Sequence, residues 1–483
     1  MGSQLIVDKE VPLCVDLDGT LIKTDLLLES IIQLVKRNPF YLIISIGWLL
    51  KGKAYFKSEV AKQINILPAS LPYNTEIVEY IKKDNRHLLL VTGSNIKFAE
   101  CVAEHLGIFD EVIASDAITN VTKSNKLKIL VNRFGQKGFD YIGNDRDDWS
   151  VWPAARRVLV VAKEGGFLKK TRNKFTIDEE FLLPKISFRS FIKAIRAHQW
   201  VKNLLIFVPF LLEHSYNDLQ SFLIVALGFV SMSLLASLTY IVNDLLDLEA
   251  DRTNKVKRLR AFASGLISVK QALLIMTALV LLVFMIAAQL PMLFQLILCA
   301  YFLSTLSYSF LFKRVAILDV CVLASLYTLR IVGGSVVINA EWSFWLLAFS
   351  MFFFLSLALA KRVSELENIK QEQGLFPVGR GYQVVDLPML TSTGVSSGLL
   401  SILVVALYIN SEKVEQMYQY PQILWLICPL LLYWIGRVWM ITARGKMHED
   451  PILFAIRDRV SMFTAAIAGL VVIGAVFLPK LFS

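Results

Sequence analysis

Charged residues are scarce in this sequence. Asp, Glu, Lys and Arg together make up 19% of the 483 residues, whereas soluble globular domains average about 25%. Apolar residues make up 55%, which excludes a disordered or fibrous chain. Residues 1–187 have a mixed composition, but residues 191–482 contain one long apolar run after another. The composition therefore predicts a water-soluble N-terminal half and a membrane-embedded C-terminal half.

Cysteine is also sparse, and no two cysteines form a Cys-x-x-Cys pair. Their scatter argues against a disulfide framework and a cysteine-ligated metal, so we expect reduced thiols. The five positions are Cys14, Cys101, Cys299, Cys321 and Cys428. The first residues lack the basic stretch, apolar core and small-residue cleavage site of a signal peptide. We therefore expect the soluble half to stay in the cytosol.

Nine apolar runs have the length of about 20 residues that crosses ~30 Å of hydrocarbon. They are residues 195–213, 219–243, 269–289, 291–312, 316–338, 342–361, 386–410, 421–440 and 461–480. If the first run leaves the cytosol, the cytosolic loops carry the basic residues of 252–260, 313–314, 361–380 and 444–459. The opposite side carries little beyond Lys413 and Lys480. This asymmetry follows the positive-inside rule, and it explains the net charge of +10 better than nucleic-acid binding does.

A stripe of carboxylates follows the second run. On a helix, Asp244, Asp247 and Asp251 fall on one face, with Asn243 beside Asp247. Three like charges repel one another unless a cation lies among them, and carboxylate oxygens suit Mg²⁺ with a substrate phosphate. The basic residues that follow, Lys255, Lys257, Arg258 and Arg260, could hold further phosphate charge. The alternative is a polar helix end with a positive-inside loop.

This stripe resembles the first aspartate-rich motif of the UbiA-type prenyltransferase superfamily. The resemblance implies a bundle of nine transmembrane helices over residues 191–483, with Mg²⁺ and diphosphate bound at the cytosolic face. It also implies that Mg²⁺ on Asp244, Asp247 and Asp251 stabilises a leaving diphosphate, supported by Lys257 and Arg258.

Three further segments, 196–203, 326–334 and 359–366, are similar to a branch that transfers phosphoribose from phosphoribosyl diphosphate to polyprenyl phosphate. The second aspartate-rich motif of the prenyl-diphosphate enzymes is missing. Lys361, Arg362 and Glu365 stand in its place, and the two cations favour a more highly phosphorylated donor.

The same segments supply candidate substrate-binding residues: Gln199, Lys202, Asn203, Tyr327, Arg330, Lys361, Arg362 and Glu365. The cations are expected to hold the 5-phosphate of the donor or the phosphate of the lipid, and the sequence does not divide these roles. Arg330 lies within an apolar run, where a structural pair with Asp319 is the alternative. The charged loop 444–459 either borders the site or is simply solvated.

In the soluble half, the segment 13–21 is predicted to be an apolar strand that ends in Asp16, Asp18, Gly19 and Thr20. Residues two apart in a strand point to the same face, so both carboxylates converge at the end of a strand, where open α/β sheets bind ligands. Asp16 could attack phosphorus, and Asp18 could protonate the leaving oxygen. The alternative is a chance motif in a tight turn.

Downstream residues make a chance motif improbable. Thr92 ends a second strand, Lys126 opens a helix, and Asp148 follows a further strand. In this order the five residues resemble the motifs of the haloacid dehalogenase (HAD) phosphatase superfamily. The resemblance implies a Rossmann-like α/β domain over residues 1–162, with phosphoryl contacts from Thr92 and Lys126. Asp16, Asp18 and Asp148 would bind Mg²⁺, and Asn144 stands where the family has a carboxylate.

Two segments of this half lack motifs. Residues 24–80 have a helical pattern and are expected to form a cap over the HAD site. Within them, the run 39–50 is too short to span a bilayer, so membrane-surface contact and packing under the cap both stay open. Residues 163–190 are expected to form a polar linker.

Together these resemblances imply a bifunctional enzyme of a bacterial cytoplasmic membrane, with the HAD domain and both sites in the cytosol. The membrane half would attach 5-phosphoribose to a decaprenyl-type polyprenyl phosphate. The HAD domain would then remove the 5-phosphate, giving polyprenyl-phosphoryl ribose for a cell-envelope polysaccharide. Two alternatives stay open: a prenyltransferase that uses polyprenyl diphosphate and an aromatic or lipid acceptor, and a non-catalytic membrane scaffold or transporter. The oligomeric state is not predicted.

Overall fold

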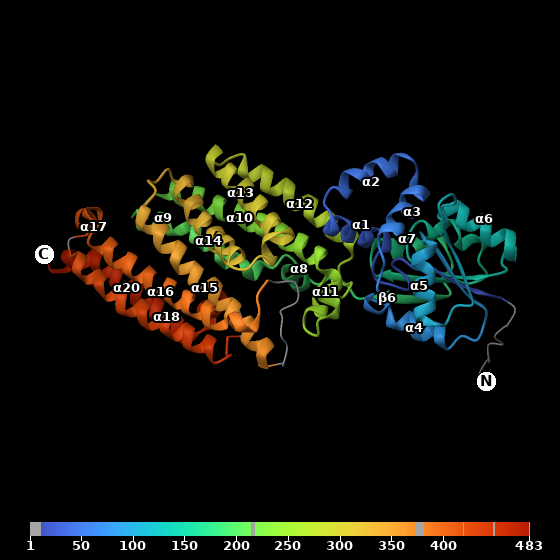
Figure 1. The fold of residues 1–483 in the computed structure, drawn as a ribbon. Helices are drawn as coiled ribbons and strands as arrows, with labels where there is room; N and C mark the ends of the chain where they lie inside the picture. The colour runs from blue at the N-terminus through green and yellow to red at the C-terminus, as the bar shows by residue number, and fades with distance from the viewer. Residues whose placement is uncertain (1–10, 214–217, 372–380, 419, 448–449, 483) are drawn as a thin grey trace, which may run out of the picture. The chain divides into compact units, whose positions relative to one another are not determined.

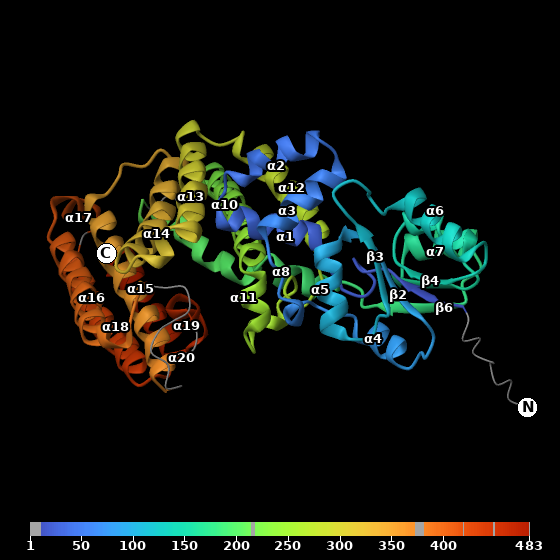
Figure 2. The same ribbon diagram turned by 45° about the vertical axis from the view of Figure 1, so that its right-hand side comes forward.

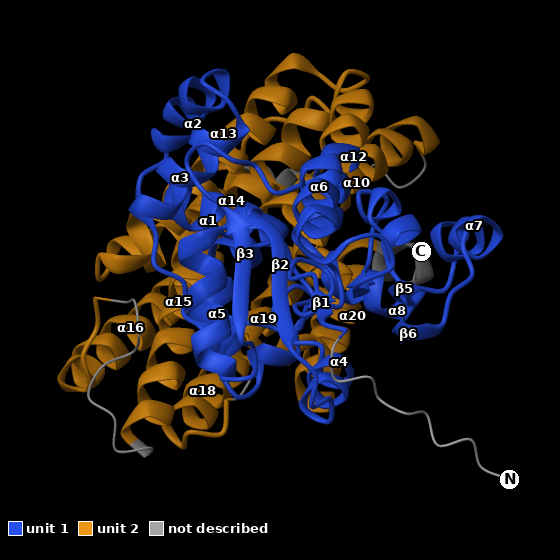
Figure 3. Cartoon of the chain, turned by 90° about the vertical axis from the view of Figure 1, so that its right-hand side faces the viewer, with its two compact units in different colours: residues 1–195, 240–278 blue, residues 196–239, 279–483 orange. Residues whose placement is uncertain are grey.

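The computed structural model describes residues 11–213, 218–371, 381–418, 420–447 and 450–482 (Figure 1). The chain divides into two compact units, coloured separately in Figure 3. The first contains residues 1–195 and 240–278, and the second contains residues 196–239 and 279–483. The aspartate-rich segment 240–252 therefore belongs to the same unit as the N-terminal half.

A six-stranded parallel sheet forms the centre of the first unit, with the strand order β3-β2-β1-β4-β5-β6. The strands are short apolar runs, as expected for a sheet with both faces covered. Their bounds are β1 Leu13–Val15, β2 Leu88–Asn95, β3 Glu111–Ser115, β4 Asp140–Gly143, β5 Val158–Lys163 and β6 Glu179–Leu183. The chain order reverses beside β1, and open α/β sheets bind ligands at the carboxyl ends of the strands there.

Helices cover both faces of this sheet. Side chains alternate along β1, so Leu13 and Val15 enter one apolar core with Phe98 of α5, while Cys14 enters the other with Leu130 of α6. Figure 2 shows α5 on one side of the strands and α6 and α7 on the other. The helices are α1 Leu26–Arg37, α2 Tyr41–Leu50, α3 Lys53–Gln63, α4 Thr75–Lys82, α5 Ile96–Leu106, α6 Lys123–Phe134, α7 Gly166–Lys174 and α8 Phe188–Ala194.

The segment predicted as a linker, residues 163–190, is instead part of the α/β domain. It forms α7 and then β6, which pairs with β5 from Leu159 to Lys163. Leu168 and Phe181 are buried in the two cores. The prediction was wrong because the many charged residues here form the outer face of an amphipathic helix.

The remaining helices are mostly long and apolar. They include α10 Leu219–Leu246, α11 Leu248–Thr253, α12 Val269–Ala287, α13 Met292–Phe310, α14 Leu318–Val337, α15 Phe344–Gln371, α16 Leu387–Ile409, α17 Glu412–Met417, α18 Ile427–Ala443, α19 Pro451–Arg457 and α20 Arg459–Phe482. Among the described residues, eight helical segments are long and apolar enough to cross a membrane. Multiple membrane spans are thereby supported, but the predicted number of nine is not.

The first predicted span, residues 195–213, is not one continuous helix. It forms the 3₁₀ helix η4, Ala197–Ile206, followed by the six-residue α9, Phe207–Leu212. Pro209 lacks an amide hydrogen, which weakens a regular helix here. Gly334 lets η4 lie directly on α14, since a Cβ at this position would lie 2.1 Å from the carbonyl oxygen of Ile206. This contact brings the polar residues of η4 beside α14.

Candidate active sites

The carboxylates of β1 meet a buried lysine in the first unit. Lys126 Nζ, near the start of α6, donates to Asp16 Oδ1 at 2.8 Å and to Tyr141 Oη at 2.6 Å. The Tyr141 hydroxyl in turn donates to Asp148 Oδ1 at 2.8 Å. The structure therefore brings together Asp16, Lys126 and Asp148, as the sequence predicts, and adds Tyr141 as the link between them.

Asp18 is held by two hydrogen bonds that the sequence does not reveal. Its Oδ1 accepts from the Leu26 amide at 2.8 Å, and its Oδ2 accepts from Ser94 Oγ at 2.5 Å. Thr92 is fully buried within β2, which continues to Asn95, and its Oγ1 accepts from the Ser94 amide at 3.0 Å. Ser94, two residues beyond the predicted Thr92 and on the same face of the strand, is thus a site residue that motif matching missed.

The loop after β4 is organised by Asp148. Its Oδ2 accepts from the amides of Asn144 at 2.8 Å and Asp145 at 3.1 Å. The Asn144 side chain lies against Gly19, because a Cβ at Gly19 would be 2.0 Å from Asn144 Nδ2, and Gly19 also has a positive φ of 79°. Only glycine at position 19 allows the two loops to approach this closely.

Negative charge dominates the pocket that these residues form. The pocket has a volume of about 170 Å³, and six aspartates and three lysines line it: Asp16, Asp18, Asp25, Asp145, Asp147, Asp148, Lys57, Lys123 and Lys126. Burial raises the pKa of Asp16 and of Asp18 to about 7. An excess of hard oxygen donors fits a cation such as Mg²⁺.

Two of the lysines that line this pocket come from different helices, α3 and α6. Lys57 of α3 donates to the Gly93 carbonyl at 2.5 Å and to Asn120 Oδ1 at 2.8 Å, and the sequence did not single it out. Lys126 lies 3.6 Å from Asp148 as well as touching Asp16. Nowhere in the described residues do three His, Cys, Asp or Glu side chains surround one point closely enough to enclose an ion.

The aspartate-rich segment of the same unit departs from a single helical stripe. The helix α10 ends at Leu246, and Asp247, with φ −103° and ψ 14°, begins α11. Asp244 and Asp251 are buried and converge on one atom, since Arg260 Nη1 donates to them at 3.3 and 2.7 Å. Asp247 pairs instead with Lys36 of α1 at 3.2 Å.

The residues that were predicted to act together with these aspartates differ from them in burial and location. Lys257 and Arg258 form the exposed 3₁₀ turn η5, Lys257–Leu259, and Arg260 is the loop cation that touches the carboxylates. Asn243 is half-buried on the last turns of α10. Arg252, directly after Asp251, forms a buried pair with Glu29 of α1 at 2.5 and 2.8 Å.

In the second unit, two predicted cations share one carboxylate. Lys202 Nζ of η4 and Lys361 Nζ of α15 donate to Asp450 Oδ2 at 2.9 and 3.0 Å. Asp450 also caps α19 by accepting from the Ile452 amide at 3.2 Å. Burial raises its pKa, but Lys361 and Lys202 outweigh this effect and keep the pKa well below its usual range. The charged loop 444–459 therefore contributes a site residue.

Arg330 joins this group through aromatic and amide contacts. Its Nε donates to Asn203 Oδ1 at 2.8 Å, and its Nη2 donates to the Tyr301 hydroxyl at 3.0 Å. Tyr327 lies between the two kinds of cation, with its ring centre 5.3 Å from the Arg330 guanidinium and 5.7 Å from Lys202 Nζ. Among the described residues, the hydrogen-bond partners of Arg330 are neutral, and the alternative pair with Asp319 is not formed.

Asp319 pairs with Arg362 instead. Arg362 is 2% exposed, and its three terminal nitrogens donate to Asp319 at 2.7 Å, Glu365 at 2.6 Å and Tyr308 at 3.0 Å. Tyr382 also donates to Asp319. Through these contacts Arg362 joins α13, α14 and α15, and the predicted role of Arg362 and Glu365 in substrate binding stays a prediction.

Gln199, another residue predicted to bind substrate, lies next to a tryptophan that is hydrogen-bonded within the protein. It is half-buried on η4, beside Trp200, whose Nε1 donates to Ser237 Oγ at 2.9 Å. An internal hydrogen bond of this kind anchors Trp200 in the protein.

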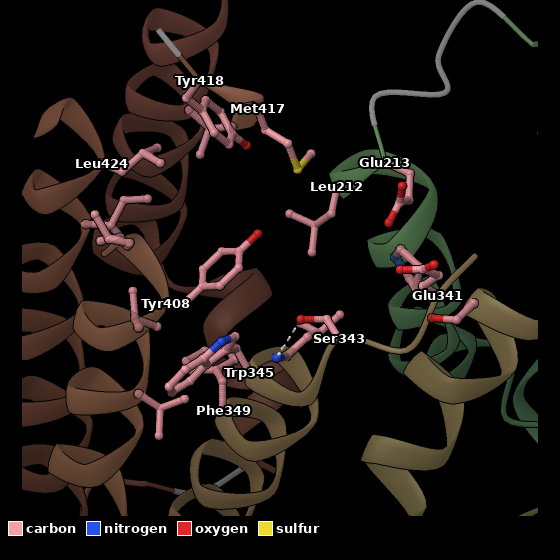
Figure 4. Close-up of a pocket in the computed structure, with 18 of the residues that line it drawn as sticks. Leu212, Glu213, Glu341, Ser343, Trp345, Phe349, Tyr408, Met417, Tyr418 and Leu424 are labelled. Carbon is pink, nitrogen blue, oxygen red and sulfur yellow. Dashed lines mark hydrogen bonds between the residues drawn. The ribbon is translucent and has the colours of Figure 1, made fainter. Parts of the chain in front are cut away.

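A separate apolar cavity of about 270 Å³ lies elsewhere in the second unit. Trp345, Phe349, Tyr408 and Tyr418 surround it, and Glu213 and Glu341 lie along one side (Figure 4). None of the predicted site residues lines this cavity. Its walls suit a hydrocarbon chain, and the two carboxylates disfavour a phosphate.

Comparison with known proteins places these sites in context. A model described as the UbiA prenyltransferase family matches residues 204–467. The chain is 37% identical to the uncharacterized protein y4nM of Sinorhizobium fredii over 95% of its own length and 90% of that protein. It is 32% identical to the nodulation protein NoeC of Azorhizobium caulinodans over 61% of its own length and 94% of that protein.

Two further likenesses are more distant. The decaprenyl-phosphate phosphoribosyltransferase of Mycolicibacterium smegmatis is 33% identical over 38% of this chain, which spans 59% of that protein. The structure of a UbiA homolog from Archaeoglobus fulgidus bound to DMAPP and Mg²⁺ is 19% identical, with a TM-score of 0.43, over 58% of this chain and 98% of that one.

Proposed function

The chain belongs to the UbiA prenyltransferase family, and we propose that its membrane half transfers 5-phosphoribose from phosphoribosyl diphosphate to a polyprenyl phosphate. The membership implies a transferase. The finer assignment draws on the likeness to decaprenyl-phosphate phosphoribosyltransferases and on the cations that replace the second aspartate-rich motif. The product, polyprenyl-phosphoryl 5-phosphoribose, would give polyprenyl-phosphoryl ribose for a cell-envelope polysaccharide after its 5-phosphate is removed.

The observation that carries this proposal is the charge of the Lys202, Lys361, Arg330 and Asp450 group. These four residues have a formal charge of +2, since they comprise three cations and one carboxylate. Asp450 accepts from Lys202 and Lys361, and Arg330 joins the group through the Tyr327 ring. A phosphate dianion balances that charge, and the two lysines and the guanidinium offer charge-assisted donors. Two phosphorylated substrates therefore match the chemistry of this group better than a hydrocarbon and an aromatic acceptor do.

The leaving diphosphate would be held at the aspartate-rich segment. Asp244 and Asp251 converge on one donor atom of Arg260, so both can also face a single cation in the same place. Mg²⁺ bound there would stabilise negative charge on the departing diphosphate. Arg260 would then turn toward the phosphate oxygens, where its charge has the same effect.

For the α/β domain we propose a phosphatase of the HAD type that acts on the 5-phosphate of the lipid product. Asp16 attacks phosphorus, and the bond from phosphorus to the ribose oxygen breaks. Asp18 donates its proton to that oxygen and then takes a proton from the water that hydrolyses the aspartyl phosphate. The raised pKa of Asp18, about 7, suits a group that must be protonated first and basic afterwards.

The test of the transferase is the transfer of label into lipid. Purified full-length protein receives Mg²⁺, polyprenyl phosphate and phosphoribosyl diphosphate labelled in the ribose. We expect label in the lipid phase, with strong loss in Asp244→Asn and no loss in Asp386→Asn, a carboxylate on the exposed turn before α16. If label moves only from polyprenyl diphosphate, the protein is a prenyltransferase of the other type.

The test of the phosphatase uses the same reaction with a second label in the 5-phosphate. Wild-type protein should release inorganic phosphate after transfer, whereas Asp16→Asn should accumulate a lipid that carries both labels. Release of phosphate by Asp16→Asn at the wild-type rate would exclude the phosphatase assignment and leave the transferase untouched.

A further inference from the structure

A second, much larger cavity adjoins the phosphatase pocket within the first unit. Its volume is about 1100 Å³, and Asp18, Asp145 and Asp147 line both spaces. A phosphate group and its metal fill only the smaller pocket. The larger one therefore has room for the rest of a substrate, and its walls indicate what that substrate is.

One wall comes from the loop that follows the aspartate-rich segment. Leu259, Ser264, Gly265, Leu266 and Ser268 line it, although these residues lie more than 200 positions after Asp18. The wall is therefore built from the sequence region that carries the transferase motif.

This loop is packed firmly on the α/β domain. Gly265 has a φ of 71°, and a Cβ there would lie 2.7 Å from the Lys23 Cβ. Lys163 Nζ donates to the Leu266 carbonyl at 2.9 Å. Arg252 donates to the Ala263 carbonyl at 3.1 Å while it pairs with Glu29. The wall is thus a built part of the cavity.

Another part of the cavity wall is the first turn of a membrane helix. Lys270 and Gln271 line the cavity and are the second and third residues of α12. This helix is one of the eight that are long and apolar enough to span a bilayer. A cavity that extends from the phosphatase carboxylates to such a helix can admit a headgroup whose lipid stays in the membrane.

Side chains of both charges line the cavity. The acidic ones are Asp18, Asp25, Asp145 and Asp147, and the basic ones are Lys23, Arg146, Lys163 and Lys270. A metal-bound phosphomonoester suits the carboxylates, and a phosphodiester suits the cations.

We propose that this cavity binds the headgroup of a lipid-linked sugar with two phosphates, its terminal phosphate at Asp16 and its lipid-bearing phosphate at Lys270. The proposal rests on the phosphatase function proposed above and defines its substrate class. It makes Lys270 a specificity residue, since a free sugar phosphate has no second phosphate to contact it. The loop 254–268, which follows the aspartate-rich segment of the proposed transferase, would then also line the substrate cavity of the proposed phosphatase.

The experiment compares two substrates of the full-length protein: polyprenyl-phosphoryl 5-phosphoribose and ribose 5-phosphate. The measured quantity is the ratio of their kcat/KM values for phosphate release. Lys270→Ala should lower this ratio about tenfold, through a higher KM for the lipid. Lys270 is exposed, so its removal does not threaten folding. The control Lys62→Ala removes an exposed lysine of α3 and should keep the wild-type ratio.

A second variant probes the wall itself. Gly265→Ala should lower the ratio more strongly than Lys270→Ala, because the new Cβ displaces the loop from Lys23. Unchanged ratios in both variants would overturn the proposal while leaving the phosphatase in place. If wild-type protein hydrolyses neither substrate, the phosphatase function itself is wrong.

The apolar helix α2 carries an independent inference. Four of its ten residues, Leu42, Ile43, Ile46 and Leu50, have large apolar side chains that are more than half exposed, and so has Phe40 at its N-cap. Basic residues flank it on both sides, Lys36 and Arg37 before it and Lys51 and Lys53 after it. At about 1.5 Å per residue it is too short to span a bilayer.

We infer that α2 lies in the surface of the bilayer that holds this chain. Exposed apolar side chains would enter the acyl boundary while the flanking lysines and arginine meet anionic headgroups. Tyr41 and Trp48 turn the other way and pack against the apolar core of the α/β domain. The helix would thereby hold the phosphatase pocket close to its lipid substrate.

Photocrosslinking of the full chain in nanodiscs with diazirine-bearing anionic lipid tests this placement. Lipid adducts should appear on the peptide containing residues 40–50 and on α12, and not on α6, a solvent-facing helix of the same domain. The double variant Ile43→Glu with Ile46→Glu should lose the α2 adducts and keep those on α12. Adducts on α12 alone, or crosslinks from α2 to a second copy of the chain, would overturn the inference.

Discussion

Two sites of this chain carry charge of opposite sign. The proposed phosphatase pocket around Asp16 in the first unit is negative, and the group of Lys202, Lys361, Arg330 and Asp450 in the second unit, called the lysine group below, is positive. Around Asp16, aspartates outnumber lysines six to three, so the pocket needs a cation before an anionic substrate can bind. In the group of Asp450, Lys202, Lys361 and Arg330, the cations outnumber the carboxylate three to one, so the group can accept an anion directly. If both groups bind phosphorylated sugars as proposed, the two sites would depend on metal to very different extents.

The largest expected effect concerns the buried ion pair between Arg362 and Asp319 in the second unit. Arg362→Gln should destabilise the second unit by about 3–5 kcal/mol, because it leaves Asp319 buried without its cation. The midpoint of thermal unfolding in detergent should fall by on the order of 10 °C. Arg314→Gln, at an exposed position, should change it little. Retained stability with lost transfer would instead make Arg362 a substrate ligand.

The second-largest effect concerns how strongly the pocket around Asp16 and Asp18 binds Mg²⁺ at different pH values. Burial raises the pKa of Asp16 and Asp18 to about 7, so protons compete with the metal below that pH and not well above it. Calorimetric titration should show at least about tenfold weaker Mg²⁺ binding at pH 5.5 than at pH 8. The comparison uses Asp244→Asn, which leaves the phosphatase pocket as the measured site. An affinity that does not change with pH would contradict the charge excess described here.

The smallest effect concerns the lysine group itself. Lys361→Ala should raise one KM, for phosphoribosyl diphosphate or for polyprenyl phosphate, about tenfold, since one charge-assisted contact is lost. The substrate affected identifies the phosphate that Lys361 holds. Lys370→Ala, on the exposed end of α15, is the matched control. Equal kinetics in both variants would show that Asp450, and not substrate, is the functional partner of Lys361.

Much of the phosphatase pocket was predictable because its residues follow strands. Parallel strands bring their carboxyl ends to one edge, so Asp16, Asp18 and Asp148 had to lie near one another once the strands were recognised. Ser94 and Lys57 were missed, although alternation along β2 could have indicated Ser94. Lys57 comes from a helix whose packing no local pattern specifies.

The contacts of the lysine group, in contrast, were hard to predict from the sequence. Asp450 lies 248 residues from Lys202 and 89 from Lys361 in the chain, and only charge in the loop 444–459 hinted at a role. Arg330, the partner of Asp319 that the sequence offered, lies on the same helix α14 eleven residues away, and at about 1.5 Å per residue this separation is too long for an ion pair. Only the packing of α15 on α14 shows that Arg362 takes this place.

By itself the sequence determined the division into an α/β half and an apolar half, most of the long membrane helices and the residues at the ends of the central strands. These features depend on hydrophobic periodicity and run length, which are local. Only the tertiary structure decided that 163–190 completes the sheet, that 195–213 is broken at η4 and α9, and that the loop 254–268 lines the phosphatase cavity. Such outcomes depend on contacts between distant segments, whose free energies no single segment contains.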